Sequence, residues 1–257
     1  MLLIDAGNTR IKWAVPAPGL PESGRWLQHG ALARGEAEQL AQVWAALGPV
    51  GPVCVSNVAG PALRDTLDKV LKQAFGADVA IEWFASTPER AGLRNAYRNP
   101  GQLGCDRFAA AIGARSLFPG EELVVATCGT ATTIDAVSAE GVFEGGMILP
   151  GLGTMATSLA LSTAQLPQID GVAPPEQAFA DNTVDAIVSG CIAAQAGAIE
   201  HALAERRRVR PGRPLRCLLA GGAGLLLAPH LDTGDAPLEK VDNLVLIGLH
   251  AAVTHGR

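Results

Sequence analysis

A glycine hairpin occurs twice in this chain. Its first copy covers residues 2–15, with Gly7 at the turn, and its second covers residues 124–137, with Gly129 at the turn; the two align without a gap. Each has the pattern of an apolar strand, a tight turn with small hydroxyl or amide side chains, and a returning strand. Such a turn directs backbone N–H groups and short polar side chains at one point, which suits a phosphate. The repeat predicts a duplicated fold that holds a polyphosphate from both sides.

The order of the expected elements repeats in the same way. The first half has strands at 2–5, 10–15, 24–29, 52–56 and 79–84 and helices at 33–47, 60–75 and about 106–117. The second half has strands at 122–127, 131–137, 142–148 and 215–220 and helical segments at 152–163, 182–208 and 242–254. Apolar residues at helical spacing support the helices, and Pro119-Gly120 marks the boundary. We expect an α/β protein with two tandem ribonuclease-H-like domains, 1–118 and 119–257, an architecture that resembles the actin, Hsp70 and sugar and acetate kinase superfamily.

Composition limits the class of protein. Hydrophobic residues make up 48% of the 257 residues, which supports a substantial core. The apolar runs at 217–220 and 244–249 are too short to span a bilayer, and no signal peptide is expected. We therefore predict a cytoplasmic protein without a membrane partner. The net charge of −5 argues against a nucleic-acid partner.

Cysteines, histidines and arginines give weaker signals. The five cysteines contain no C-x-x-C pair and are expected to be buried free thiols, and the five histidines are expected to be structural. A basic cluster covers Arg206, Arg207, Arg208, Arg210, Arg213 and Arg216. A solvated helix end, where cations complement the helix dipole, is favoured over a DNA or RNA patch.

The first hairpin carries a candidate phosphate site. Asp5 ends the first strand, where its carboxylate could hold Mg²⁺ against ATP phosphates. Gly7 allows a close approach of the backbone, Asn8 and Thr9 can donate hydrogen bonds, and Lys12 offers a cation to the transferred phosphoryl group. The alternative is an ordinary hairpin in which Asn8 and Asp5 only satisfy the turn.

Two further glycine segments are candidates for nucleotide binding. The second hairpin offers the hydroxyls of Thr130, Thr132 and Thr133, and Asp135 either positions a metal or water or is a structural carboxylate. The run 218–224 leads from a strand into glycines, which could let an adenosine lie flat on the turn. A glycine-rich helix start explains that run equally well.

The segment 97–107 contains the candidate catalytic residue. Asp106 falls at a helix N-terminus, where the dipole favours an ionised carboxylate that can deprotonate a hydroxyl. Arg107 can hold a carboxylate or phosphate in bidentate fashion. An Asp N-cap followed by a solvated Arg is the competing interpretation.

Six sequence blocks, in order along the chain, resemble those of the type III pantothenate kinases. They are Asp5-x-Gly-Asn-Thr-x-x-Lys12, Tyr97, Gly104-x-Asp-Arg107, Gly129-Thr-Ala-Thr-Thr, Gly145-Gly-x-Ile-x-Pro-Gly151 and Asn182-Thr-x-x-Ala186. The resemblance implies a kinase that uses ATP and Mg²⁺ to phosphorylate pantothenate to 4'-phosphopantothenate, the first step of coenzyme A biosynthesis.

The resemblance also implies roles for individual residues. ATP would contact Asp5, Ala6, Gly7, Asn8, Thr9, Arg10, Ile11, Lys12 and Thr130. Pantothenate would contact Tyr97, Gly104, Cys105, Asp106, Arg107 and Thr183, with Asp106 as the proton acceptor. The family is similar in forming homodimers with the active site near the interface. Small residues in the expected helix 182–208 fit such packing, and burial within one subunit explains them equally well.

One position departs from the family pattern. Many members have an aspartate two residues before the glycine of the second hairpin, where it helps to bind K⁺ or NH₄⁺, and this chain has Thr127. Threonine has no charge, so loss of the monovalent-cation requirement and its retention through carbonyls and hydroxyls both stay open. Two rival functions also stay open: a kinase or hydrolase with another substrate, and an accessory partner in transcription on the same fold.

Overall fold

Contacts divide the chain into two compact units in the computed structural model, which describes residues 1–17, 24–163, 166, 167, 169, 173–175 and 177–255. The first unit comprises Met1–Pro119, Gly141–Phe143 and Asn243–Arg257, and the second comprises Gly120–Glu140 and Glu144–Asp242. The last helix therefore groups with the first unit, although the predicted second half, 119–257, included it. The units are defined by contacts in space, whereas the predicted domains 1–118 and 119–257 were defined by a repeat in the sequence. The tandem domains therefore stay a prediction.

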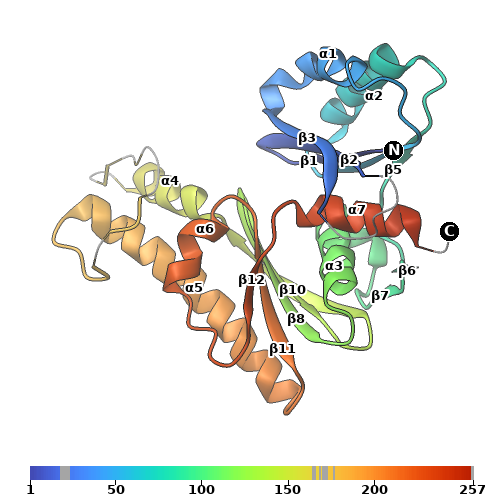
Figure 1. Cartoon of the computed structure of the whole chain (residues 1–257). Helices are drawn as coiled ribbons and strands as arrows, with labels where there is room; N and C mark the ends of the chain where they lie inside the picture. The colour runs from blue at the N-terminus through green and yellow to red at the C-terminus, as the bar shows by residue number, and fades with distance from the viewer. Residues whose placement is uncertain (18–23, 164–165, 168, 170–172, 176, 256–257) are drawn as a thin grey trace. The chain divides into compact units, whose positions relative to one another are not determined.

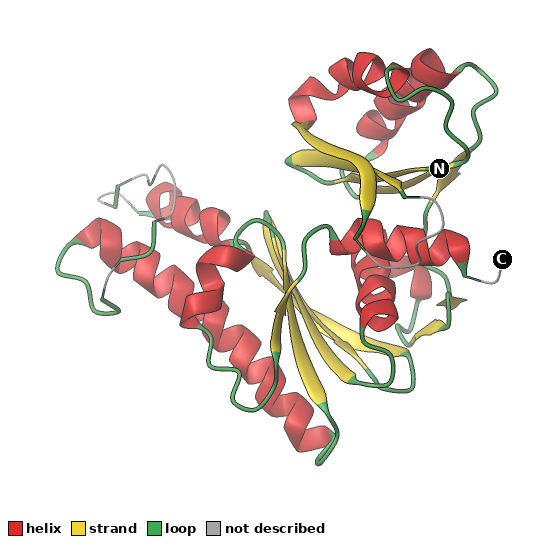
Figure 2. Cartoon of the chain, viewed as in Figure 1, coloured by secondary structure: helices red, strands yellow, loops and turns green. Residues whose placement is uncertain are grey.

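The first unit is built on a five-stranded sheet with the order β3-β2-β1-β4-β5 (Figures 1 and 2). Strands β1, β2 and β3 are antiparallel neighbours, and β4 and β5 continue the sheet in parallel to β1. The strands are β1 Leu2–Ala6, β2 Arg10–Pro16, β3 Trp26–Ala33, β4 Val53–Asn57 and β5 Ile81–Trp83. Three antiparallel strands followed by parallel crossovers is the predicted ribonuclease-H-like order.

Helices cover this sheet and build its core. The helices of the unit are α1 Leu40–Ala45, α2 Pro61–Phe75, α3 Cys105–Leu117 and α7 Leu244–Thr254, with 3₁₀ turns η1 Arg34–Gln39 and η2 Pro100–Gln102. α2 begins with a proline at N1, as predicted, and buries Leu63, Leu67, Val70 and Leu71 against the sheet. The predicted helix 33–47 is α-helical only from Leu40, because its first part is wound as the tighter η1 turn.

Two glycines let α3 and α7 cross closely. A Cβ added to Gly113 of α3 would lie 2.6 Å from the carbonyl oxygen of Leu244, and one added to Gly248 of α7 would overlap the carbonyl oxygen of Ala109. No side chain larger than hydrogen fits at either position. Since residues 104–107 lie at the N-terminus of α3, this crossing fixes the helix that presents them.

The second unit contains a sheet with the order β12-β11-β8-β9-β10. β8 and β9 form the antiparallel second hairpin, and β11 runs parallel to β8. Its strands are β8 Glu122–Cys128, β9 Ala131–Val137, β10 Val142–Pro150, β11 Leu215–Ala220 and β12 Leu238–Lys240. Its helices are α4 Leu152–Ser162, α5 Thr183–Val209 and α6 Gly224–Leu227, with the 3₁₀ turn η3 Ala228–His230.

Three short strands were not predicted. They are β6 Glu89–Arg90, β7 Leu93–Asn95 and β12 Leu238–Lys240. β6 and β7 belong to the first unit, where β7 pairs with the first two residues of β10, Val142 and Phe143. Two or three residues cannot display an alternating pattern, which is why sequence periodicity misses such strands.

The arginine cluster is an ion-pair network, so the prediction of a solvated helix end is wrong for Arg206. That residue is 4% exposed, and its guanidinium bonds to Glu122, 1% exposed, and to Glu144. The other five arginines also pair with carboxylates, in the pairs Arg207–Asp235, Arg208–Glu205, Arg210–Glu144, Arg213–Glu140 and Arg216–Glu121. Except for Glu205, these partners lie far away in sequence from their arginines, so local spacing could not reveal them.

Two composition-based expectations can be compared with the structure. All five cysteines are free, and all but the partly exposed Cys105 are buried, as expected. The apolar runs considered for a membrane span did not include α5, the one helix in the described part of the chain that is long and apolar enough to cross a bilayer. Half of its most apolar window is buried inside the structure, as in a helix that packs within a protein core.

Candidate active site

Asp5 and Lys12 lie side by side at the base of the first hairpin. They are register partners on β1 and β2, and Ser56 of β4 is the register partner of Asp5 on its other side. Register partners of adjacent strands project to the same face of a sheet. Lys12, Asp5 and Ser56 therefore form a polar row across three strands.

The turn of the first hairpin is open to solvent. The Gly7 N–H donates to the carbonyl of Arg10 at 3.1 Å, and the side chains of Asn8, Thr9 and Arg10 are exposed. The flanking Ala6 and Ile11 are fully buried, so their side chains belong to the core. A ligand at this turn would meet backbone groups and the three exposed side chains.

The N-terminus of α3 contacts the end of β4, beside the polar row, through the Cys105 side chain. The Cys105 thiol lies 3.3 Å from the Ser56 hydroxyl and donates to the Asn57 carbonyl at 3.6 Å. Gly104 is the N-cap, and a Cβ there would lie 2.8 Å from Oδ1 of Asp106. The glycine therefore leaves room for the Asp106 carboxylate, which accepts a hydrogen bond from the Arg107 N–H at 2.8 Å.

The competing interpretation of Asp106 as an N-cap is wrong. Asp106 lies in the first turn of α3, one residue beyond the first helical residue, and the N-cap is Gly104. Arg107 is not solvated either, because it is only 7% exposed. Both side chains are thus held within the unit.

Burial and mutual repulsion perturb the two carboxylates. Burial and, to a smaller extent, the negative charge of Asp106 raise the pKa of Asp5, Lys12 opposes the rise, and the net result is a pKa of about 7. Burial also raises the pKa of Asp106, against hydrogen bonding and charge from Arg107. A pair of coupled carboxylates with raised pKa values is a strong acceptor for a proton or a divalent cation.

Arg107 is enclosed by two aromatic rings. Its Nη1 donates to the Tyr97 hydroxyl at 3.0 Å, and its guanidinium carbon lies 5.8 Å from the centroid of the Tyr97 ring and 5.7 Å from that of Phe143. The two rings meet edge to face, with centroids 5.6 Å apart. Sequence reasoning identified Tyr97 and Arg107 and missed Phe143, since a buried strand phenylalanine carries no signal of its own.

The backbone of the second hairpin is packed against neighbouring segments of its unit, although Gly129, Thr130 and Ala131 at its turn are exposed. The Thr130 side chain is exposed, but its carbonyl accepts from the Gly151 N–H and from the Thr154 hydroxyl, both at 2.9 Å. A Cβ at Gly151 would overlap the Gly129 carbonyl. Thr132 is 1% exposed, so the expectation that its hydroxyl serves a phosphate is wrong.

The glycine turn after β11 packs on this hairpin. Gly221 has φ +87°, and a Cβ there would overlap the Cys128 carbonyl, which also accepts from the Ala223 N–H at 3.1 Å. Gly221 is therefore required for the left-handed backbone and for the close approach. Asp135 is 2% exposed and lines a cavity of about 250 Å³ with Glu144 and Arg206, away from the turn. This position favours its structural role.

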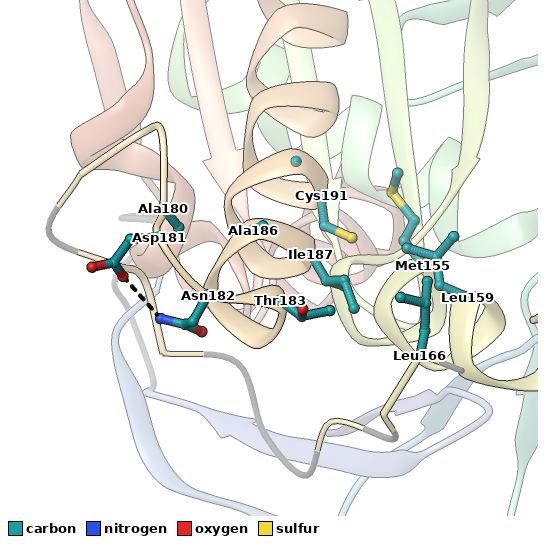
Figure 3. A pocket seen from close by; sticks show the side chains of 11 residues that line it. Met155, Leu159, Leu166, Ala180, Asp181, Asn182, Thr183, Ala186, Ile187 and Cys191 are labelled. Carbon is teal, nitrogen blue, oxygen red and sulfur yellow. Dashed lines mark hydrogen bonds between the residues drawn. The ribbon is translucent and has the colours of Figure 1, made fainter. Parts of the chain in front are cut away.

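Thr183 begins α5 and lines the wall of a larger pocket (Figure 3). Asn182 caps the helix by accepting from the Asp185 N–H at 3.0 Å. The pocket has a volume of about 710 Å³, and Met155, Leu159, Leu166, Ile187 and Cys191 provide much of its apolar lining. Thr130 and Thr183 belong to the second unit, whereas the remaining predicted site residues belong to the first.

The carboxylates near the first hairpin suit Mg²⁺ bound together with a nucleotide better than a metal ion that is coordinated by protein side chains alone. Among the described residues, no group of three or more His, Cys, Asp or Glu side chains could hold a metal ion. Mg²⁺ in nucleotide sites uses one or two carboxylates and takes its remaining ligands from phosphates and water. Asp5, with its raised pKa and its place beside the first hairpin, matches that requirement.

Solved structures with similar folds include several sugar kinases. A protein assigned as a 2-dehydro-3-deoxygalactonokinase from Sinorhizobium meliloti aligns with a TM-score of 0.61 and 17% identity, covering 98% of this chain and 97% of that one. A protein assigned to the Baf family of transcriptional activators, from Campylobacter jejuni, aligns with a TM-score of 0.56 and 19% identity over 98% and 97% of the two chains. At such low identity these likenesses show the fold alone. The fold is that of the sugar-kinase and actin-like class.

Sequence relatives identify the family. A profile of the type III pantothenate kinase family matches residues 1–205. A type III pantothenate kinase from Janthinobacterium sp. (strain Marseille) is 58% identical, covering 99% of this chain and 98% of the relative. Another, from Herminiimonas arsenicoxydans, is 56% identical over the same shares. The chain belongs to the type III pantothenate kinase family.

Proposed function

We propose that this protein transfers the γ-phosphoryl group of ATP to the primary hydroxyl of pantothenate. The products would be ADP and 4'-phosphopantothenate, so the enzyme would begin coenzyme A biosynthesis. The observation that carries the proposal is the group formed by Asp106, Arg107 and Asp5 in the first unit: two coupled carboxylates beside a buried, ring-enclosed guanidinium. Family membership supplies the identity of the acceptor.

Asp106 would act as the general base. Its raised pKa brings the carboxylate closer to the acidity at which proton transfer from a hydroxyl is efficient, and the Arg107 N–H fixes its orientation. Asp5 would hold Mg²⁺, which would neutralise charge on the phosphates when bound. Lys12, Thr9 and Thr130 would bind phosphate oxygens and thereby position the γ-phosphorus for in-line attack.

Arg107 and Tyr97 would bind the carboxylate of pantothenate. A guanidinium held in one plane presents parallel N–H groups that match a carboxylate. Gly104 and Cys105 line the same helix start, and Thr183 would contribute a hydroxyl from the second unit. Such a site would suit an acceptor that carries both a carboxylate and a primary hydroxyl.

A homodimer is part of the proposal. Large apolar side chains of the second unit are exposed on β10, α4, the segment before α5 and the first turn of α5: Ile148, Leu159, Leu161, Phe179 and Val184. Leu161 and Phe179 are 83% and 96% exposed, which is unusual for such residues unless a partner covers them. A second copy of the chain, as in the family, would be that partner.

The remaining expectations follow from charge and burial. We propose a cytoplasmic enzyme without a nucleic-acid or membrane partner, since carboxylates match the arginine cluster and half of the apolar window of α5 is buried. A K⁺ or NH₄⁺ ion would bind through hydroxyls and carbonyls near Thr127.

The test is an assay of purified protein with MgATP and pantothenate, with and without K⁺ or NH₄⁺, combined with light scattering for the dimer. We expect pantothenate-dependent ADP release and the appearance of 4'-phosphopantothenate. ADP release without pantothenate would favour a hydrolase or another acceptor. An absence of ADP release under every salt would overturn the proposal and favour the transcriptional accessory role, which the kinase names of the close relatives do not support.

A further inference from the structure

We propose that Phe143 is a positioning residue for the acceptor substrate, because it holds Arg107 and Tyr97 in the geometry that binds it. The inference rests on the proposed function only in naming pantothenate as the ligand of those two residues. The positioning itself follows from contacts within the first unit.

Phe143 forms one wall of a closed aromatic clamp. Its side chain is fully buried, its ring meets the Tyr97 ring edge to face at 64°, and the guanidinium of Arg107 lies 5.7 Å from its centroid. The Tyr97 ring lies at nearly the same distance, 5.8 Å, and the Tyr97 hydroxyl accepts from Arg107. Arg107 is thus held by two π faces and one hydrogen bond, which together restrict its side-chain torsions.

The backbone fixes Phe143 relative to the loop that carries Tyr97. Phe143 is the register partner of Asn95 in the β10–β7 pair, and its carbonyl accepts from the Ala96 N–H at 3.0 Å. The Asn95 side chain accepts from the Tyr97 N–H at 3.0 Å and donates to the Pro100 carbonyl at 3.2 Å. Strand β10 therefore places the Phe143 ring on one side of Arg107. The same strand also fixes the loop that carries Tyr97, through the hydrogen bonds of Ala96 and Asn95.

Preorganisation is the expected benefit of this arrangement. An arginine side chain loses considerable rotamer freedom when it binds a carboxylate, and a binding site that has already ordered the side chain avoids that loss at binding. Removing the Phe143 ring would take away one of the contacts that order the guanidinium while leaving the hydrogen bond between Asp106 and the Arg107 N–H in place. The effect should appear in substrate binding and not in the chemical step.

The test compares Phe143→Leu with Phe84→Leu. Phe84 is a matched control: it is 4% exposed, it stacks on another ring, Phe108, and it lies 4.9 Å from the guanidinium of Arg90. We expect Phe143→Leu to raise KM for pantothenate about tenfold, with kcat and KM for ATP changed less than about twofold, as for the loss of a cation–π and a ring contact. Phe84→Leu should lose comparable stability and keep the wild-type KM for pantothenate.

A spectroscopic measurement can report on the environment of the Tyr97 ring independently of enzyme activity. The chain has a single tyrosine, Tyr97, so incorporation of 3-fluorotyrosine gives ¹⁹F signals from this ring alone. Phe143→Leu should shift and broaden the signals, because the ring current of Phe143 and the fixed position of Arg107 are lost. Phe84→Leu should leave them unchanged.

The two readouts separate the possible failures. If the folded Phe143→Leu variant keeps both the ¹⁹F signals and the KM for pantothenate, the inference is overturned. If no variant or wild-type protein uses pantothenate while the signals still change in Phe143→Leu alone, the positioning role stands and the proposed function fails.

Discussion

The two glycine hairpins share a sequence pattern and differ in what surrounds them. The first exposes Asn8, Thr9 and Arg10, and the strand register places Asp5 opposite Lys12 at its base. The second lies against Gly151 and Gly221, and the corresponding positions at its base are Thr127 and Ile134. The first hairpin has two charged residues at its base, whereas the second has none at the corresponding positions and is packed against two neighbouring glycines, although Gly129, Thr130 and Ala131 at its turn are exposed. The comparison teaches that two copies of one backbone pattern can differ in charge and in how closely other segments pack on them.

The strongest test of this difference is the loss of the carboxylate that acts beside the first hairpin. We expect Asp106→Asn to lower kcat about a thousandfold with an unchanged circular dichroism spectrum, as for loss of a general base. Asp185→Asn is the control, since Asp185 is the acidic residue in the first turn of α5 in the other unit. A steady-state assay in which both variants keep more than a tenth of wild-type turnover would contradict the assignment.

Packing of the second hairpin predicts the next effect. Gly151→Ala should lower the free energy of unfolding by about 3 kcal/mol, because the new methyl group would overlap the Gly129 carbonyl. Gly7→Ala should cost less than about 1 kcal/mol, since its Cβ would lie 3.3 Å from the Arg10 carbonyl, the shortest contact it would make. Urea unfolding of both variants measures the difference. Equal costs would mean that the two hairpins are equally enclosed.

Charge at the base of the first hairpin predicts a pH dependence of stability. The pKa of Asp5 is raised from 3.8 to about 7 in the folded protein, so the folded state binds the proton more tightly than the unfolded chain does. The contribution of this group is therefore most favourable below about pH 4 and is lost as the pH rises to about 7.

Asp5→Asn removes the loss of stability that ionisation of Asp5 causes at high pH. The variant should exceed the wild type in stability by on the order of 1–2 kcal/mol at pH 8, with little difference near pH 4. Thr127→Asn, at the equivalent position of the second hairpin, should shift the melting temperature equally at both pH values. A pH-independent difference between Asp5→Asn and the wild type would show that Asp5 is not the titrating group.

The smallest effect concerns the missing carboxylate of the second hairpin. Thr127→Asp should increase the stimulation of turnover by K⁺ severalfold relative to the wild type, because a carboxylate supplies the charge that threonine lacks. Thr127→Asn, of nearly equal size and without charge, is the matched control in a titration with KCl at constant ionic strength. If all three proteins respond alike to K⁺, Thr127 does not lie near a cation.

The sequence predicted what depends on local pattern. The strands other than β6, β7 and β12, the two hairpins and the helix start near Asp106 all followed from alternation, glycine placement and helical spacing. The contacts of Arg206 with Glu122 and Glu144, and of Phe143 with Arg107, join residues far apart in the chain. No local pattern marks such pairs, because burial of a charge or a ring is decided by which strands become neighbours.

Other failures have the same origin. α7 is mostly apolar, a composition that is compatible with a helix but does not reveal the unit on which it packs. The two turns of η1 were predicted as α-helix, since an i,i+3 pattern supports both windings. The N-cap role considered for Asp106 failed because Gly104 takes that place, and the aspartate lies two residues after it, within the first turn of α3.

The close crossing of α3 and α7 has a consequence for folding during synthesis. A ribosome completes α3, then the entire second unit, and only afterwards α7, which starts at Leu244. Until then, α7 does not cover the surface around Ala109 and Gly113 of α3, the helix that carries Asp106. The second unit, by contrast, is complete before α7 is synthesised and can fold earlier. Premature termination before residue 243 would leave this groove uncovered and expose apolar surface to chaperones and proteases.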